Sequence, residues 1–172
     1  ILNVIIKKPG TPGYENSEPL IIQGHMDMVC VKTDDSNHNF DTDPIEMIVE
    51  GDVLRANNTT LGGDDGIAVA YGLAILDADD IPHPPLELLV TTNEETGMDG
   101  AMELKADHLS STRLLNLDTE VEGDFLVSCS GGSNIDLSFD IEREVNSSKA
   151  YKLSISGLKG GHSGVEIDKQ RA

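Results

Sequence analysis

Short hydrophobic runs alternate with polar, glycine-rich segments along the first 120 residues of the chain. A continuous apolar run is typical of a strand that is buried on both faces of a sheet. Such runs predict strands at residues 2–6, 20–22, 86–92 and 113–117. We expect the first two strands to pair antiparallel, because a turn rich in proline and glycine joins them.

Three further segments complete the pattern of this region. Residues 67–76 are almost wholly apolar, which favours a buried helix over an amphipathic one. Residues 100–109 predict a second helix, and residues 45–56 predict a hairpin around a Glu-Gly-Asp turn. Strands that alternate with helices are typical of a parallel sheet. We therefore predict an α/β fold with a mixed, mostly parallel sheet and helices on both faces.

The pattern changes after Gly131. Residues 135–141 and 151–156 alternate between apolar and polar side chains, which is the period of half-exposed strands. We therefore place a domain boundary near Gly131, with one domain in residues 1–131 and the beginning of another in residues 132–172.

Charge and cysteine content exclude several classes of function. The 172 residues include 31 acidic and 12 basic side chains, for a formal net charge of −19. Nucleic acids and anionic membranes attract basic surfaces, so we expect neither as a partner. Cys30 and Cys129 are too few for a disulfide framework or a thiolate metal site. Without a signal peptide or a long apolar run, a cytoplasmic location is the expectation.

Acidic residues and one histidine gather where predicted strands end or a predicted helix begins. These residues are His25, Asp27, Asp64, Asp65, Glu94, Glu95 and Asp118. In an open α/β sheet, ligands bind just outside the carboxyl ends of the strands. One histidine and three carboxylate clusters at such ends are what a two-metal hydrolase needs.

Each side chain can be given a role in such a site. Asp64, in a turn flanked by glycines, is the natural bridge between two ions, whereas Asp65 is better explained as the N-cap of the following helix. His25 and Asp118 would each complete the shell of one metal. One glutamate of the adjacent pair would bind metal while the other acts as a base. Imidazole and carboxylate ligands suit zinc, with manganese or cobalt as substitutes.

Every one of these features also has a simpler explanation. A histidine and an aspartate two residues apart are commonly part of an ordinary loop, adjacent glutamates are usually a solvated face, and Asp118 alone could cap a turn. A non-catalytic acidic module that binds calcium is a different class of function. Calcium sites use oxygen ligands, and the loop pattern of an EF-hand is absent from the sequence.

Four ordered motifs resemble those of the M20 family of zinc peptidases. They are GHMD at 24–27, TLGGDDG at 60–66, NEETG at 93–97 and LD at 117–118. Two further segments, LDTEVEG at 117–123 and LKGGHSG at 158–164, resemble the branch of that family that cleaves Xaa-His dipeptides. The resemblance implies metal-dependent hydrolysis of small peptides, with a related tripeptidase or N-acyl-amino-acid deacylase as the alternatives within the family.

The resemblance also implies roles for single residues. His25, Asp64, Glu95 and Asp118 would bind two zinc ions, with Asp64 as the bridge and a cis peptide bond between Asp64 and Asp65. The same comparison makes Asp27 the residue that orients His25, and Glu94 the general base. Residues from 132 onward would begin an α+β lid domain that forms a homodimer, where His162 would reach the substrate.

One departure from the family pattern affects what the chain can do alone. The last metal ligand of the family is a histidine near the C-terminus, and no residue of this sequence corresponds to it. The chain also begins at Ile1 rather than at a methionine. We therefore expect the sequence to be part of a longer enzyme and to be inactive by itself. A degenerate, non-catalytic member of the family would not be expected to keep Glu94 and all four ligands.

Overall fold

The computed structural model describes residues 2–119, 121–129, 131, 133, 135–145, 147–160 and 167–169. The chain divides into two compact units, Ile1–Glu122 and Gly123–Ala172. All four strands of the main sheet and the long helix lie in the first unit. In the described part of the chain, no helix is both long enough and apolar enough to cross a membrane.

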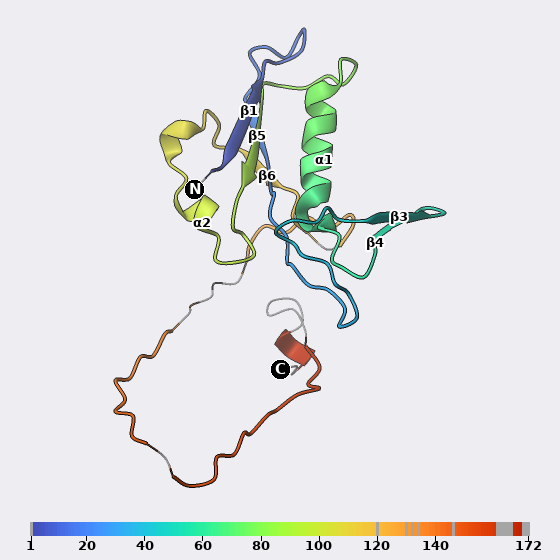
Figure 1. The fold of residues 1–172 in the computed structure, drawn as a ribbon. Coiled ribbons are helices and arrows are strands. Elements are labelled where there is room, and N and C mark those ends of the chain that lie inside the picture. The colour runs from blue at the N-terminus through green and yellow to red at the C-terminus, as the bar shows by residue number, and fades with distance from the viewer. Residues whose placement is uncertain are drawn as a thin grey trace. The chain divides into compact units, whose positions relative to one another are not determined.

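The first unit is built on a four-stranded mixed sheet (Figure 1). Its strands, in spatial order, are β1 (Val4–Lys8), β5 (Leu86–Thr91), β2 (Leu20–His25) and β6 (Leu114–Asn116). β1 is antiparallel to β5, whereas β5 and β2, and β2 and β6, run parallel. The predicted mostly parallel α/β sheet is therefore confirmed.

The predicted pairing of the first two strands is wrong. β5 lies between β1 and β2 and pairs with both, so the turn that follows β1 leads across the sheet rather than into a hairpin. All six residues of β5 are buried, whereas β1 exposes three of its five. A strand as buried as β5 is stabilised most when it has neighbours on both sides, whereas the half-exposed β1 can lie at the edge of the sheet.

Helix α1 (Gly63–Asp77) packs against β2 and β5. Its side chains join a core formed by Ile22, Leu86, Leu88 and Val90. The helix is less buried than its composition predicts: Ile67, Tyr71 and Leu73 are 52%, 58% and 49% exposed. A helix that rests on a single sheet buries one face only, and nothing among the described residues covers the other.

Smaller elements surround the sheet. The predicted hairpin is confirmed as β3 (Met47–Glu50) and β4 (Val53–Ala56). The second predicted helix is shorter than expected, with a turn of α-helix α2 (Asp99–Met102) and a 3₁₀ turn η1 (Ala106–His108). Lys105 between them has an extended backbone, with φ −102° and ψ 143°, which interrupts the helix. Figure 1 shows these turns on the opposite side of the sheet from α1.

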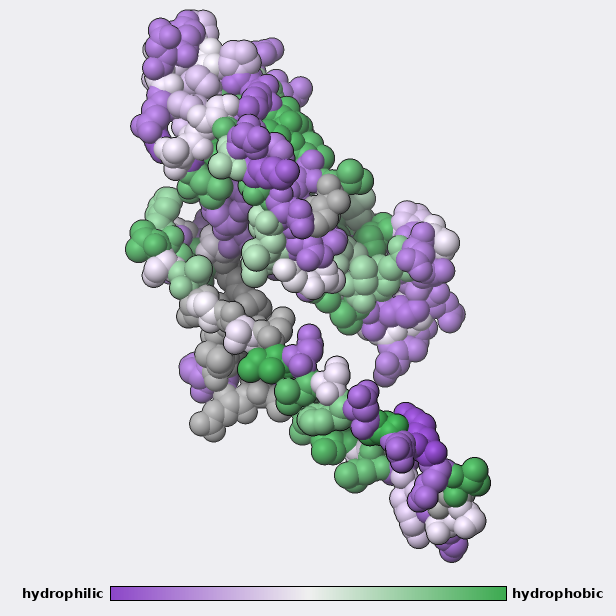
Figure 2. Space-filling view, turned by 90° about the vertical axis from the view of Figure 1, so that its left-hand side faces the viewer, coloured by the Kyte–Doolittle hydropathy of each residue, from purple (hydrophilic) through white to green (hydrophobic). Residues whose placement is uncertain are grey.

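The second unit contains none of the predicted strands. Residues 135–141 and 151–156 have no secondary structure, and their apolar side chains are open to solvent, including Phe139 at 79% and Leu153 at 90%. Figure 2 shows hydrophobic residues at the surface of the molecule. An alternating segment forms a strand only when a neighbour satisfies its backbone and covers its apolar face. The described residues supply no such neighbour. The described part of this unit does contain a short 3₁₀ turn, η2 (Ile167–Lys169). The boundary near Gly131 stays a prediction, and His162 lies outside the described residues.

Candidate metal centre

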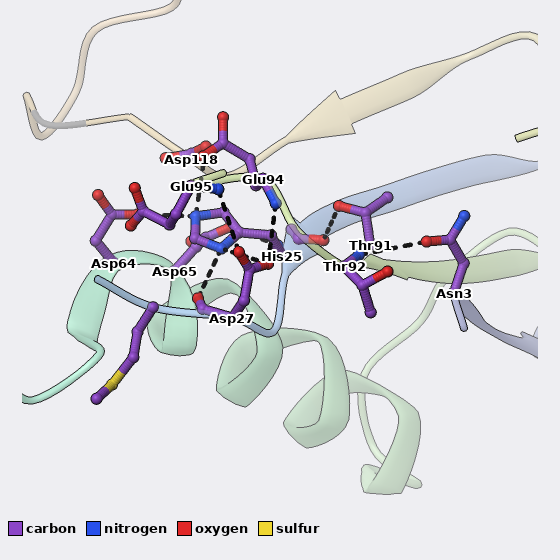
Figure 3. A network of polar contacts seen from close by, with 12 residues as sticks. Asn3, His25, Asp27, Asp64, Asp65, Thr91, Thr92, Glu94, Glu95 and Asp118 are labelled. Atoms are coloured by element: carbon purple, nitrogen blue, oxygen red, sulfur yellow. Dashed lines mark hydrogen bonds and ion pairs between the residues drawn. The ribbon is translucent and has the colours of Figure 1, made fainter. Parts of the chain in front are cut away.

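The carboxyl ends of three neighbouring parallel strands meet at one edge of the sheet, and the predicted site residues lie there (Figure 3). His25 is the last residue of β2, Glu94 and Glu95 follow β5, and Asp118 follows β6. Asp64 comes from the other side of the site, at the beginning of α1. The topology therefore brings together residues that are up to 93 positions apart in the chain.

Two overlapping groups of side chains have the spacing of a metal site. One potential ligand atom each from His25, Asp64 and Asp118 lies within 4.8 Å of the others, and the same is true of His25, Glu94 and Glu95. Nε2 of His25 is 3.1 Å from Oδ1 of Asp64 and 3.9 Å from Oδ2 of Asp118. His25 and Asp118 thus lie in the same group, and their assignment to one ion or to two stays a prediction.

Asp27 orients His25, but through its backbone. Its carbonyl oxygen is 2.9 Å from Nδ1 of His25, whereas its carboxylate oxygen is 3.6 Å away, too far for a hydrogen bond. Because a carbonyl can only accept, Nδ1 carries the proton in the neutral ring. Nε2 lies 3.1 Å from Oδ1 of Asp64, and because a carboxylate also only accepts, Nε2 donates this hydrogen bond when it carries a proton. Loss of that proton leaves Nε2 with the lone pair that a metal requires, while Nδ1–H stays on the Asp27 carbonyl.

The carboxylate of Asp27 has a different task. Its two oxygens accept the backbone N–H groups of Glu94 and Glu95, each at 3.1 Å. Burial would raise the pKa of Asp27, but these two hydrogen bonds stabilise the ionised form and lower it below its ordinary value. Asp27 therefore ties the end of β2 to the glutamate pair that follows β5.

Asp64 and Asp65 point to different sides of the chain (Figure 3). The peptide bond between them is cis, as the resemblance implies. The Asp64 side chain is 71% exposed and faces His25, whereas Asp65 is 2% exposed and accepts the N–H of His25 at 3.2 Å. Burial and the charge of Asp118 raise the pKa of Asp65 to about 6, although hydrogen bonds from the N–H groups of His25 and Ala68 act to lower it. The N-cap position of α1 is Gly62, with no side-chain cap hydrogen bond, and Asp64 and Asp65 have non-helical φ and ψ in its first turn. The predicted N-cap role of Asp65 is therefore wrong, and its carboxylate holds the backbone of His25 instead.

The charges in the site perturb one another. Burial would lower the pKa of His25, but its hydrogen bonds to Asp64 and Asp27 and the charge of Asp118 raise it above the ordinary value. Burial, and the neighbouring carboxylates Asp118 and Glu95, raise the pKa of Glu94. A cluster of carboxylates around one imidazole is electrostatically crowded, and a bound cation relieves such crowding.

A small cavity borders this cluster. It has a volume of about 220 Å³ and is lined by Met28, Val29 and Leu61 together with Asp64 and Glu95. Met28 and Val29 were not expected at the site, nor was the contact of Asp65 with His25, whereas Leu61 lies within the TLGGDDG motif. The one feature of the sequence that could have indicated Met28 and Val29 is their position directly after Asp27.

The chain is similar to known dipeptidases. No family model matches the chain. It is 43% identical over 167 residues to the cytosol non-specific dipeptidase of Escherichia coli (strain K12). The matched region covers 96% of this chain and 34% of that protein. The crystal structure of aminoacylhistidine dipeptidase from Vibrio alginolyticus superposes with a TM-score of 0.68 at 48% identity, over 70% of this chain and 25% of the other.

Two more distant structures share the fold. Aminopeptidase PepT from Bacillus cereus matches with a TM-score of 0.53, and a tripeptidase from Staphylococcus aureus with 0.54, both at 24% identity. Each match covers 69% of this chain and 30% of the other protein. The chain thus spans about a third of the length of the curated relative that it matches.

Proposed function

We propose that this chain belongs to the M20 family of peptidases and that it forms the metal-binding part of a dipeptidase. One observation carries the proposal: His25, Asp64 and Asp118 bring potential ligand atoms within 4.8 Å of one another at the carboxyl edge of the sheet. The whole protein would hydrolyse dipeptides in a metal-dependent reaction.

The donor set fits two divalent ions, which we propose to be zinc. Neutral imidazole and carboxylates are the nitrogen and oxygen ligands that zinc accepts, with manganese or cobalt as substitutes. His25, Asp64 and Asp118 would hold one ion, and Asp64 would share its carboxylate with a second ion that Glu95 also binds. The first set is one of the two groups of the site, and Asp64 and Glu95 line the same cavity beside it.

The reaction depends on what the chain does around those ions. Bound ions would supply the positive charge that polarises the peptide carbonyl and makes a water acidic. Glu94 would take the proton of the attacking water and deliver it to the leaving amine. A pKa raised above the ordinary glutamate value improves a carboxylate as a base near neutral pH. Asp27 holds the Glu94 backbone in place through its carboxylate.

Substrate and location are part of the same proposal. The relatives are named as a dipeptidase without narrow specificity and as an aminoacylhistidine dipeptidase. We therefore propose dipeptides as the substrate class, with Xaa-His dipeptides among them, and a cytoplasmic location as for the Escherichia coli protein. Formation of a homodimer through residues 132–172 remains a prediction from the resemblance, as does the contact of His162 with substrate.

Metal analysis and a peptidase assay on the full-length gene product test the proposal. Mass spectrometry should detect two zinc ions per chain, and β-alanyl-histidine and other Xaa-His dipeptides should be hydrolysed. A chelator should abolish turnover, and added zinc should restore it. Tripeptides and N-acyl amino acids serve as comparison substrates. Activity that persists without metal, or a preference for either comparison substrate, would contradict the proposed function.

A further inference from the structure

The loop that carries the two glutamates is closed at its base by a side chain from the beginning of the chain. We call residues 92–100 the Glu94 loop. The N–H of Gly100 donates to the carbonyl of Thr92 at 2.9 Å, which brings the two ends of the loop together. The Asn3 amide then bridges both ends: Nδ2 donates to the Gly100 carbonyl at 2.7 Å, and Oδ1 accepts the Thr92 N–H at 3.3 Å (Figure 3).

This closure is closely packed. Gly100 is buried, and a Cβ atom at that position would lie 2.5 Å from Oδ1 of Asn3 and 2.5 Å from the carbonyl of Thr92. The Asn3 side chain therefore fits against bare backbone, and both of its hydrogen bonds are made to main-chain groups. An amide is the one side chain that donates and accepts in one plane over this short distance.

Further hydrogen bonds lie within the loop. The N–H groups of Gly97 and Met98 donate to the Glu94 carbonyl at 3.3 Å and 3.2 Å, and Nδ2 of Asn93 donates to Oδ2 of Asp99 at 3.3 Å. Asn93 and Met98 have φ values of 56° and 59°, in the left-handed region that non-glycine residues adopt only when their surroundings require it. At the far end, Asp27 accepts the N–H groups of Glu94 and Glu95. Asp27 beside the metal-binding residues and Asn3 at the base thus tie the loop to residues outside it.

We propose that Asn3 is a positioning residue that sets where Glu94 and Glu95 point. Its action is indirect, because it contacts neither glutamate and lies before β1. Without its amide, the Gly100 carbonyl and the Thr92 N–H lose their partner. The hydrogen bond between the Gly100 N–H and the Thr92 carbonyl still closes the base, but Asp27 is then the outside anchor that remains, so the loop can shift about it. The prediction for catalysis rests on the proposed function, whereas the prediction for loop dynamics does not.

The test compares Asn3→Ala with Asn57→Ala in the full-length gene product. Asn57 is a matched control because its Nδ2 donates to Glu46 at 2.8 Å, at the open end of the β3–β4 hairpin. Hydrogen exchange measured by mass spectrometry reports the Glu94 loop, zinc titration reports metal affinity, and kinetics on a dipeptide give kcat and KM separately.

Asn3→Ala should speed exchange in the Glu94 loop and lower kcat by about 10-fold to 10²-fold with little change in KM, since small misplacements of reacting groups have effects of that size. Asn57→Ala should leave both unchanged. Asn3→Asp, which keeps the acceptor and loses the donor, should fall between the wild type and Asn3→Ala. It also serves as the test variant if Asn3→Ala does not fold.

Three outcomes would overturn the inference. Asn3→Ala could lower the melting temperature while loop exchange and kcat match the wild type, which makes Asn3 purely structural. Equal losses in the Asn3 and Asn57 variants would show a general effect. The zinc titration could also show that Asn3→Ala weakens the ion bound by His25 as much as the ion bound by Glu95. The effect of the substitution would then lie outside the Glu94 loop. If the wild type itself lacks metal-dependent activity, the proposed function fails, and loop exchange still decides the role of Asn3.

Discussion

Replacing Gly72 with alanine tests how closely α1 approaches the sheet. A Cβ atom at Gly72 would collide with Cδ1 of Leu88 and lie 2.9 Å and 3.2 Å from its Cδ2 and Cγ. Gly66, on the same helix, has no atom within 4 Å of the corresponding position. The two substitutions are chemically identical, so the contact with β5 is the main difference between them.

The expected magnitudes follow from two opposing effects. Alanine is favoured over glycine within a helix by up to about 1 kcal/mol, at either position. Inserting a methyl group into a packed interface costs about 1–3 kcal/mol. Gly66→Ala should therefore stabilise the fold by up to ~1 kcal/mol, and Gly72→Ala should destabilise it by up to ~2 kcal/mol. The difference between the variants is then ~1–3 kcal/mol.

Urea denaturation and thermal melting of the full-length gene product measure this difference. Each kcal/mol corresponds to about 2–4 °C in Tm for a protein of about 150–250 residues, and to less in a longer chain. Gly72→Ala should also weaken zinc binding, because a displaced α1 carries Asp64 away from His25. Equal stability of the two variants, or Gly72→Ala the more stable one, would refute the proposed close contact between α1 and β5.

Three other predictions concern the site and its support. Glu94→Gln should keep its zinc and lose about 10²-fold or more in kcat, whereas Glu95→Gln should lose zinc first; identical metal content and kinetics would contradict the division of roles. Asp27→Ala removes the acceptor of two backbone N–H groups and should cost ~1–3 kcal/mol in urea denaturation, and an unchanged midpoint would argue against that anchor. Burial would raise the pKa of Glu87, but its contacts with Lys7 and with the N–H of residue 110 lower it. Its carboxylate therefore stabilises the fold above the glutamate pKa of the unfolded chain, and this is lost as pH falls through the lower folded value. The wild type should lose more stability than Glu87→Gln between about pH 7 and pH 3; parallel losses would refute the assignment.

The sequence alone determined the local elements and the chemistry that they carry. The apolar run of β5 and the hairpin of β3 and β4 could be predicted from the order of apolar and polar side chains. A strand that is buried on both faces has a continuous apolar run, and one that is buried on a single face alternates. The position of carboxylates after strands, together with the parallel sheet that the pattern predicts, was sufficient to expect Asp64 and Asp118 near His25. The identities of these residues carry the chemistry, and identity is what a sequence records.

The tertiary structure decided what depends on contacts between distant segments. Which strands are neighbours is not encoded locally, so β5 between β1 and β2 was missed. The burial of α1 was overestimated, because composition does not say how many of its faces find a partner. Likewise, the sequence suggested that the Asp27 side chain holds His25, yet its backbone makes that contact and its carboxylate holds the next loop. Asn3 lies 97 residues from Gly100, and a hydrogen bond across that separation has no signature in the sequence, because it arises only after the sheet has formed.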